Sequence, residues 1–116
     1  MLKSKIHRAT VTAADVDYEG SISLDPALMA RADILEWEQV AVLDIDNGAR
    51  LETYAIVGEP GQVKLNGAAA LLVSPGDRVI ILTYADVAES DLDAYQPTIV
   101  LVDGRNRAQE HASARD

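Results

Sequence analysis

VAVLDIDNGARLETYAIV, residues 40–57, is the stretch of sequence that decides the fold. Val40–Ile45 is rich in apolar and β-branched residues, which favour a strand. Asp46-Asn47-Gly48 follows and is typical of a tight hairpin turn, after which Leu51–Val57 resumes the apolar pattern. The stretch therefore predicts two antiparallel strands joined by a short turn.

Further strands are expected on both sides of this hairpin. Their sequences alternate apolar and polar residues or form short β-branched runs between turn residues. The expected strands are Leu2–Thr12, Ile22–Leu24, Arg78–Tyr84 and Thr98–Val102.

Helical pieces are expected to be short. Asp25 followed by Pro26 is a helix-start signal and predicts a helix over Pro26–Ala32. Ala68–Leu72 predicts another short helix, and the polar segment Thr12–Tyr18 predicts a turn or a single helical turn. Together these elements predict a mainly β fold, a small β-barrel with a few short helices.

Length and composition indicate one globular domain. The chain has 116 residues, no Cys, no Phe and one Trp. We expect the domain to span residues 1–104 and residues 105–116 to form a polar, poorly ordered tail. The lack of Cys excludes disulfides and thiolate metal sites.

The charge distribution limits the possible partners. A formal net charge of −9 argues against sequence-independent binding of nucleic acid. No apolar run is long enough to span a membrane, and the N-terminus lacks the apolar core of a secretory signal, so we expect a cytosolic protein. Lys3, Lys5, His7 and Arg8 form a local basic cluster, which fits either a small anionic substrate or a solvated strand end.

Gly20-Ser21 is the first candidate for chemistry. One interpretation is a simple turn, in which Gly supplies an unusual backbone angle. The other is a reactive peptide. Gly20 has no side chain, so its carbonyl is open to attack by the Ser21 hydroxyl, and strain at this peptide would favour the attack.

Other candidates are weaker by themselves. Thr53 and Tyr54 fit ordinary cross-strand packing as well as a site. Asn66-Gly67 fits a tight turn whose backbone N–H groups hold an anion. His7 and His111 are the only histidines, so a multi-histidine metal site is not available, and no metal site is expected.

In order and spacing, these motifs resemble the bacterial aspartate 1-decarboxylases (aspartate α-decarboxylases) of pantothenate synthesis. The matching pieces are Met1–Ala9, Tyr18–Ser21, Asp46–Arg50, Thr53–Ile56, Asn66–Ala70, Pro75–Asp77, Val79–Ile81 and Val102-Asp103. The resemblance covers nearly everything before Arg105.

The resemblance implies a double-psi β-barrel, a homotetramer with active sites between subunits, and conversion of L-aspartate to β-alanine and carbon dioxide. It also implies that an inactive precursor cleaves itself between Gly20 and Ser21. The products would be a β chain of residues 1–20 and an α chain whose Ser21 has become a pyruvoyl group. This covalent cofactor would form a Schiff base with the aspartate amine and act as the electron sink.

The resemblance also implies roles for individual residues. Tyr54 would return a proton to the substrate carbanion, and Thr53 would contact substrate and polarise the carbonyl during cleavage. Lys5 and Arg50 would bind substrate carboxylate, while Gly67, Ala68 and Ala69 would line the pocket as backbone. His7 and Asn66 are further pocket candidates.

Two departures from the family and two rival readings remain. The chain starts a few residues later than many relatives, and the loop Glu59–Asn66 is shorter, with Pro60 where relatives often have Arg. The rivals are a non-catalytic barrel that binds a ligand, and a family member that cannot complete maturation. The sequence leaves open whether a separate maturation factor is needed.

Overall fold

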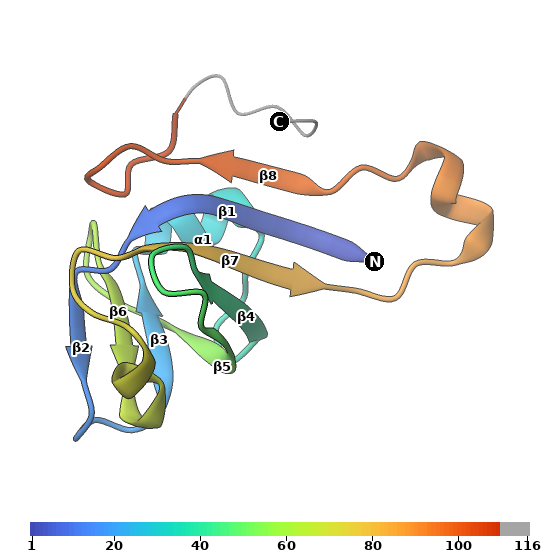
Figure 1. The fold of residues 1–116 in the computed structure, drawn as a ribbon. Helices are drawn as coiled ribbons and strands as arrows, with labels where there is room; N and C mark the ends of the chain where they lie inside the picture. The colour runs from blue at the N-terminus through green and yellow to red at the C-terminus, as the bar shows by residue number, and fades with distance from the viewer. Residues whose placement is uncertain (110–116) are drawn as a thin grey trace.

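Eight strands in one sheet and three short helices make up the computed structural model, which describes residues 1–109 (Figure 1). The strands are β1 (Leu2–Thr10), β2 (Ala13–Asp15), β3 (Ser21–Leu24), β4 (Gln39–Asp44), β5 (Arg50–Val57), β6 (Val63–Asn66), β7 (Arg78–Tyr84) and β8 (Thr98–Leu101). The α-helix is α1 (Pro26–Ala32), and the 3₁₀ helices are η1 (Gly67–Leu72) and η2 (Glu89–Ala94). The expectation of a mainly β fold with a few short helices is confirmed.

The sheet closes on itself because β1 and β2 are successive parts of one extended segment. The strand order is β2-β6-β3-β5-β4-β7-β1-β8. At the junction Val11 N donates to Asp77 O (2.8 Å) and Thr12 N donates to Val63 O (2.8 Å). The segment thus passes from its pairing with β7 to its pairing with β6 and closes the strands from β2 to β1 into a ring, and β8 pairs with β1 outside this ring. This ring and the parallel pairs β2–β6 and β3–β5 fit the barrel that the resemblance implied.

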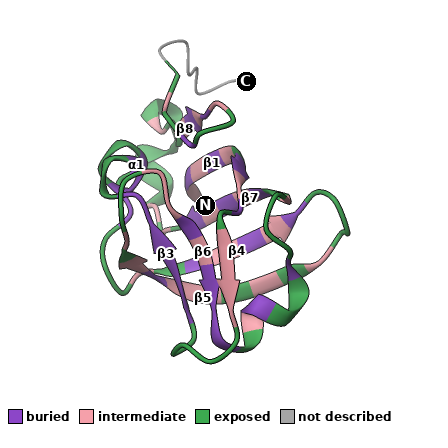
Figure 2. Cartoon of the chain, turned by 90° about the vertical axis from the view of Figure 1, so that its left-hand side faces the viewer, coloured by how far each residue is buried: buried purple, intermediate pink, exposed green. Residues whose placement is uncertain are grey.

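Buried residues occur on strands all around the ring (Figure 2), and their apolar side chains form one core cluster. Among the fully buried residues are Ile6 on β1, Ile22 and Leu24 on β3, Leu65 on β6 and Ile81 on β7. Such a core supplies most of the free energy that opposes the conformational entropy of the chain.

Helix α1 forms where the sequence predicted it. Asp25 Oδ1 accepts a hydrogen bond from Ala27 N (2.7 Å), the arrangement of an N-cap, and Pro26 needs no partner for the N–H it lacks. The second oxygen of Asp25 accepts from Gly61 N (2.9 Å), so the same side chain also holds the loop before β6.

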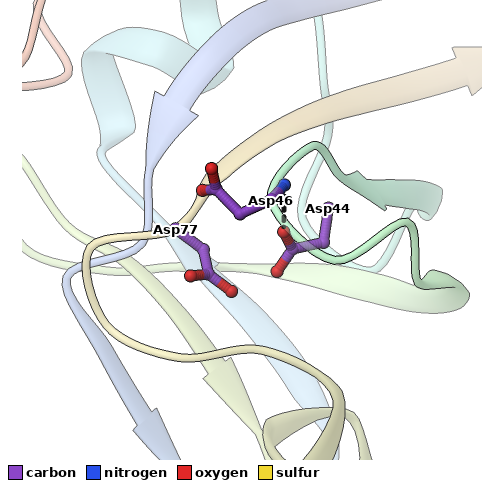
Figure 3. A group of neighbouring side chains, drawn as sticks. All are labelled: Asp44, Asp46 and Asp77. Atoms are coloured by element: carbon purple, nitrogen blue, oxygen red, sulfur yellow. Dashed lines mark hydrogen bonds between the residues drawn. The ribbon is translucent and has the colours of Figure 1, made fainter.

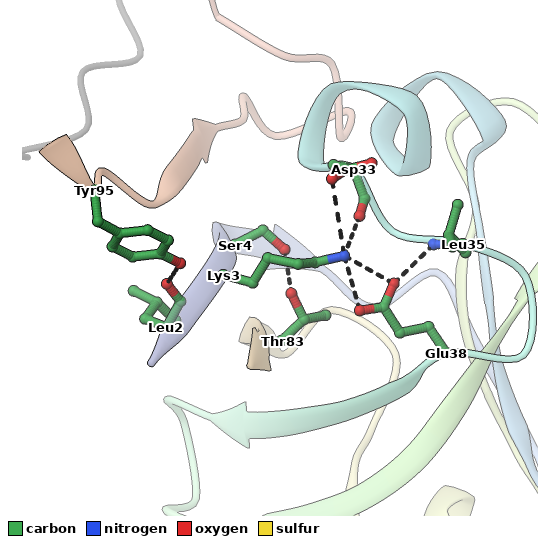
Figure 4. A network of polar contacts seen from close by, with 8 residues as sticks. All are labelled: Leu2, Lys3, Ser4, Asp33, Leu35, Glu38, Thr83 and Tyr95. Atoms are coloured by element: carbon green, nitrogen blue, oxygen red, sulfur yellow. Dashed lines mark hydrogen bonds and ion pairs between the residues drawn. The ribbon is translucent and has the colours of Figure 1, made fainter. Parts of the chain in front are cut away.

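Polar contacts hold the N-terminal half of β1 in place (Figure 4). Lys3 Nζ lies 2.9 Å from Glu38 Oε2 and also donates to the backbone oxygen of Asp33. The hydroxyls of Ser4 and Thr83 are hydrogen-bonded across β1 and β7. Tyr95, after η2, donates its hydroxyl proton to Leu2 O. These contacts link β1 to three other parts of the chain.

The structure differs from the sequence-based expectations in several segments. Thr12–Tyr18, expected to form a turn or a single helical turn, contains the strand β2 followed by a turn at Val16 and Asp17. The strand β6 was not expected. Within the acidic connection before β8, Glu89–Ala94 forms η2. Residues 105–109, expected to begin a poorly ordered tail, make defined contacts: Asn106 is buried, and Ala108 bridges to Val102. The rest of that expected tail, residues 110–116, lies outside the described residues.

Among the described residues, no helix combines the length and the apolar character needed to cross a membrane.

Candidate active site

Ser21 opens β3 at the point where the chain enters the barrel wall. The residue is 1% exposed, whereas Gly20 just before it is exposed. Ser21 Oγ accepts a hydrogen bond from Asn66 Nδ2 (2.9 Å) and donates to Glu19 O (3.2 Å). The peptide between Gly20 and Ser21 therefore joins an exposed loop to a rigid, buried strand.

Asn66 is the polar neighbour that the pairing of β3 with β6 brings to Ser21. The two residues are partners in the antiparallel register. Asn66 Nδ2 also donates to Ser23 Oγ (3.0 Å), because Ser21 and Ser23 lie on the same face of β3. Asn66 Oδ1 is buried and has no hydrogen-bond partner within the described part of the chain. An unpaired buried acceptor is costly, so this oxygen marks a place where a further donor fits.

Gly67 packs directly on Gly20. Its φ is +71°, a left-handed conformation that favours glycine. A Cβ atom on Gly67 would lie 2.6 Å from Gly20 Cα and 2.8 Å from Gly20 N. The backbone that follows forms η1, where Ala68 is exposed and Ala69 is half-buried. The close approach is possible because Gly67 carries no side chain, whereas a Cβ atom on Gly20 would meet no atom within 4 Å.

Tyr54 stands on the strand beside Ser21. β3 and β5 are parallel, and Ile22 pairs with Ala55, so Ser21 and Tyr54 come one position earlier on the two strands. Alternation then directs both side chains to the same face of the sheet. The Tyr54 ring also contacts Trp37, with ring centroids 5.8 Å apart. The sequence did not indicate Trp37, because nothing in the segment between α1 and β4 predicts that this segment contacts β5.

Arg50 and Thr53 lie on the same strand but in different settings. Arg50 is exposed and shares the face of Tyr54, whereas Thr53 points to the opposite face. Within residues 1–109 the Thr53 hydroxyl makes no hydrogen bond, and its predicted role in polarising a carbonyl stays a prediction.

Lys5 and His7 are carried by β1, which pairs with β7 and β8. His7 lines a hollow of about 290 Å³ together with Arg8, Thr10, Arg78 and residues 101–104. Burial, followed by the nearby positive charges of Lys5 and Arg8, holds the pKa of His7 below its ordinary value. The hollow is therefore a cationic environment with a neutral imidazole in its wall at neutral pH.

The predicted site residues thus fall into three groups. Gly20, Ser21, Asn66 and Gly67 are in direct contact, and Tyr54 is on the adjoining strand. Arg50 lies farther along β5, and Lys5 and His7 lie on β1. No hydrogen bond or ion pair that the structure describes joins Lys5, His7 or Arg50 to Ser21.

The chain as a whole matches a known family. The family model for aspartate decarboxylase covers residues 1–109, which is almost the complete sequence. This chain belongs to the aspartate decarboxylase family. Its activity is that of an aspartate 1-decarboxylase, a carboxy-lyase, and the resemblance recognised from the sequence motifs is confirmed. A non-catalytic binding barrel is correspondingly disfavoured.

We expect Gly67→Ala to destabilise the protein more than Gly61→Ala. Both glycines have similar positive φ angles, and that conformation alone costs an alanine about 1–2 kcal/mol. Only at position 67 would the new Cβ also collide with backbone, whereas the nearest atom at position 61 is 3.7 Å away. Urea denaturation of the two variants measures the difference. Equal losses of stability would contradict the close packing of Gly67 on Gly20.

We also expect His7 to make the fold sensitive to mild acid. Because folding lowers the pKa of His7, the unfolded chain binds a proton more readily than the folded chain does when the pH falls below the ordinary pKa of 6.5. The stability contributed at neutral pH is therefore lost as the pH falls through this range. Thermal unfolding from about pH 7.5 to about pH 5.5 should show a smaller loss for His7→Gln than for the wild type.

Lys5→Gln serves as the second variant in this experiment. It keeps the imidazole but removes one of the charges that lower the pKa, so its loss of stability should lie between the other two. Parallel curves for all three proteins would rule out the assignment.

Proposed function

We propose that this enzyme makes β-alanine for pantothenate synthesis from L-aspartate, after cleaving itself between Gly20 and Ser21 to form a pyruvoyl group from Ser21. The observation that carries the proposal is the environment of the Ser21 hydroxyl. It is buried, hydrogen-bonded to Asn66 (2.9 Å), and follows a glycine that packs against the side-chain-free Gly67. An ordinary turn has no need of such an environment.

The cleavage chemistry uses atoms of Gly20 and Ser21. Ser21 Oγ bonds to the Gly20 carbonyl carbon while the bond from that carbon to Ser21 N breaks, and the hydroxyl proton passes to the nitrogen. Loss of the Ser21 Cα proton then breaks the Cβ–Oγ bond, so that Oγ leaves as part of the Gly20 carboxylate. Water replaces the nitrogen, which departs as ammonia, and a ketone remains at the new N-terminus. Asn66 Nδ2 is within hydrogen-bonding distance of the attacking oxygen and orients it.

The residues around Ser21 fit a pyruvoyl group. This group contains fewer atoms than a serine with its amine, so the space that holds Ser21 accommodates it. Asn66 Nδ2 supplies a hydrogen-bond donor for the carbonyl oxygens of the group, and Gly67 places no side chain there. Once formed, the group supplies a carbonyl that binds the substrate amine and accepts the electrons released with carbon dioxide.

Tyr54 is the residue we assign to proton return. Its side chain shares a face with Ser21 on the neighbouring parallel strand, and contact with Trp37 limits its motion. Its phenol group can donate a proton to the substrate after the carboxylate leaves.

The substrate carboxylates require cations, and we assign Lys5 and Arg50 to them. Neither residue contacts Ser21 within one chain. Lys5 lies on β1, and Arg50 is the first residue of β5, whereas β3 pairs with the other end of β5 at Ala55. A second copy that places its cations beside Ser21 would complete the site. This supports active sites between subunits, and we assign the assembly as the homotetramer that the resemblance implies.

We expect Ser21→Ala to give an intact chain with no decarboxylase activity, because alanine has no oxygen with which to attack Gly20. Intact mass spectrometry under denaturing conditions should show one species. The wild type should show two fragments, the larger lighter by one ammonia than a chain that begins with serine. If cleavage of the wild type is slow, warming or co-expression with a maturation factor should complete it. A cleaved Ser21→Ala protein would exclude the proposed chemistry.

Tyr54→Phe should still cleave itself but decarboxylate slowly. The substitution keeps the ring against Trp37 and removes only the proton, so kcat should fall by roughly 10²–10⁴-fold, the usual contribution of a general acid. Release of β-alanine by fully cleaved protein is the measurement. Trp37→Leu, which removes the ring contact but leaves the phenol, is the matched control and should lose much less. Near-normal turnover in Tyr54→Phe would refute the assignment.

A further inference from the structure

Three aspartates from two separate turns meet on the side of the barrel where β4 ends and β7 begins. Asp44 is the last residue of β4, Asp46 lies in the hairpin turn, and Asp77 immediately precedes β7. One carboxylate oxygen from each lies within 4.8 Å of the others. Figure 3 shows the three side chains gathered between the two turns. This acidic cluster (Asp44, Asp46 and Asp77) plays no part in the proposed self-cleavage.

Each carboxylate is already oriented by the backbone. Asp44 Oδ1 accepts from Asp46 N (2.8 Å), Asp46 Oδ2 from Arg78 N (2.7 Å), and Asp77 Oδ2 from Ser74 N (3.0 Å). Asp44 and Asp77 thus each use one oxygen to hold their own turn, and Asp46 uses one to bind the start of β7. Each of the three keeps a second oxygen that receives no backbone hydrogen bond. Ligands that are fixed in this way lose little conformational freedom when they bind.

Asp44 supplies an independent sign that a ligand is missing. The residue is only 3% exposed, and its Oδ2 is buried without a hydrogen-bond partner in the part of the chain that the structure describes. A buried carboxylate oxygen without a donor or a positive charge is costly. The basic members of the ion pairs within residues 1–109 are Lys3 and Lys64, so no basic side chain in this part of the chain forms an ion pair with the cluster.

We propose that the acidic cluster binds one hard divalent cation, Ca²⁺ or Mg²⁺, through Asp44, Asp46 and Asp77. Carboxylate oxygens are the ligands that both ions prefer, and water molecules complete their coordination in sites of this kind. Asp46 is exposed and Asp77 half-buried, so the ion has access from solvent and room for water. The cation takes the place of the partner that Asp44 Oδ2 lacks.

The position of the cluster gives the cation a structural role. It connects the β4–β5 hairpin to the turn that leads into β7. The same hairpin is linked to η1, because Asn47 Nδ2 donates to Leu72 O (2.8 Å). The bound ion therefore braces the strand that carries Arg50 and Tyr54 without contacting substrate.

Titration of the metal-free full-length protein with Ca²⁺ or Mg²⁺ tests the proposal. After treatment with EDTA, calorimetry at mildly alkaline pH should give one ion per chain for at least one metal. Saturation should raise Tm by about 4 °C or more, because a ligand that binds only the folded state stabilises it.

Two variants and one control locate the site. Asp77→Asn keeps an oxygen for Ser74 N but removes the charge, and should weaken binding by roughly tenfold or more and abolish the rise in Tm. Asp46→Asn, at an exposed position, should do the same and serves if Asp77→Asn does not fold. Asp91→Asn, exposed on η2, removes the same charge elsewhere and should bind like the wild type.

A shared proton is the rival explanation of the cluster. Burial and the neighbouring Asp77 raise the pKa of Asp44, so a protonated Asp44 would donate to Asp77 without any metal. In that case neither ion would produce heat of binding or shift Tm at millimolar concentration, and the proposal would be overturned. Binding that survives unchanged in both Asp77→Asn and Asp46→Asn would overturn it as well.

Discussion

The burial of β3 is the constraint on which the rest of the structure depends. All four residues of this strand are buried, and it is hydrogen-bonded on one side to β5 and on the other to β6. Its apolar members fill the core, while Ser21 and Ser23 face the single amide of Asn66. Because β3 has no free edge, its first residue is held in a fixed position.

This arrangement also explains how a chain cut before Ser21 would remain folded. Residues 1–20 contain β1 and β2, which pair with β7, β8 and β6. Those hydrogen bonds and the burial of Ile6, Ala9 and Val11 do not depend on an intact peptide after Gly20. Cleavage at the end of the exposed loop would therefore leave the two pieces held together.

Charged side chains of each sign gather at separate places on the fold. With a net charge of −9, the protein gathers several of its cations on β1, where Lys3 pairs with Glu38, and Lys5 and Arg8 stand near His7. The acidic cluster is the reverse case, a group of like charges held close by backbone hydrogen bonds. Such groups are tolerated in proteins where a ligand or a proton compensates them.

The amino-acid sequence by itself determined the β4–β5 hairpin, α1 and β7, since turn residues, an N-cap and apolar periodicity are local signals. Family motifs in it also indicated Ser21, Tyr54 and the glycines. It did not reveal β6, or the burial of Asn106, which hydrogen-bonds to Thr10 and Gly61 across the fold. Only the tertiary structure decided that Asn66 meets Ser21, that Gly67 packs on Gly20, and that three aspartates from separate turns share one place. These contacts arise from strand pairing between distant segments. One pairing is selected by the free energy of burying the whole core, and a local sequence pattern carries no information about that free energy.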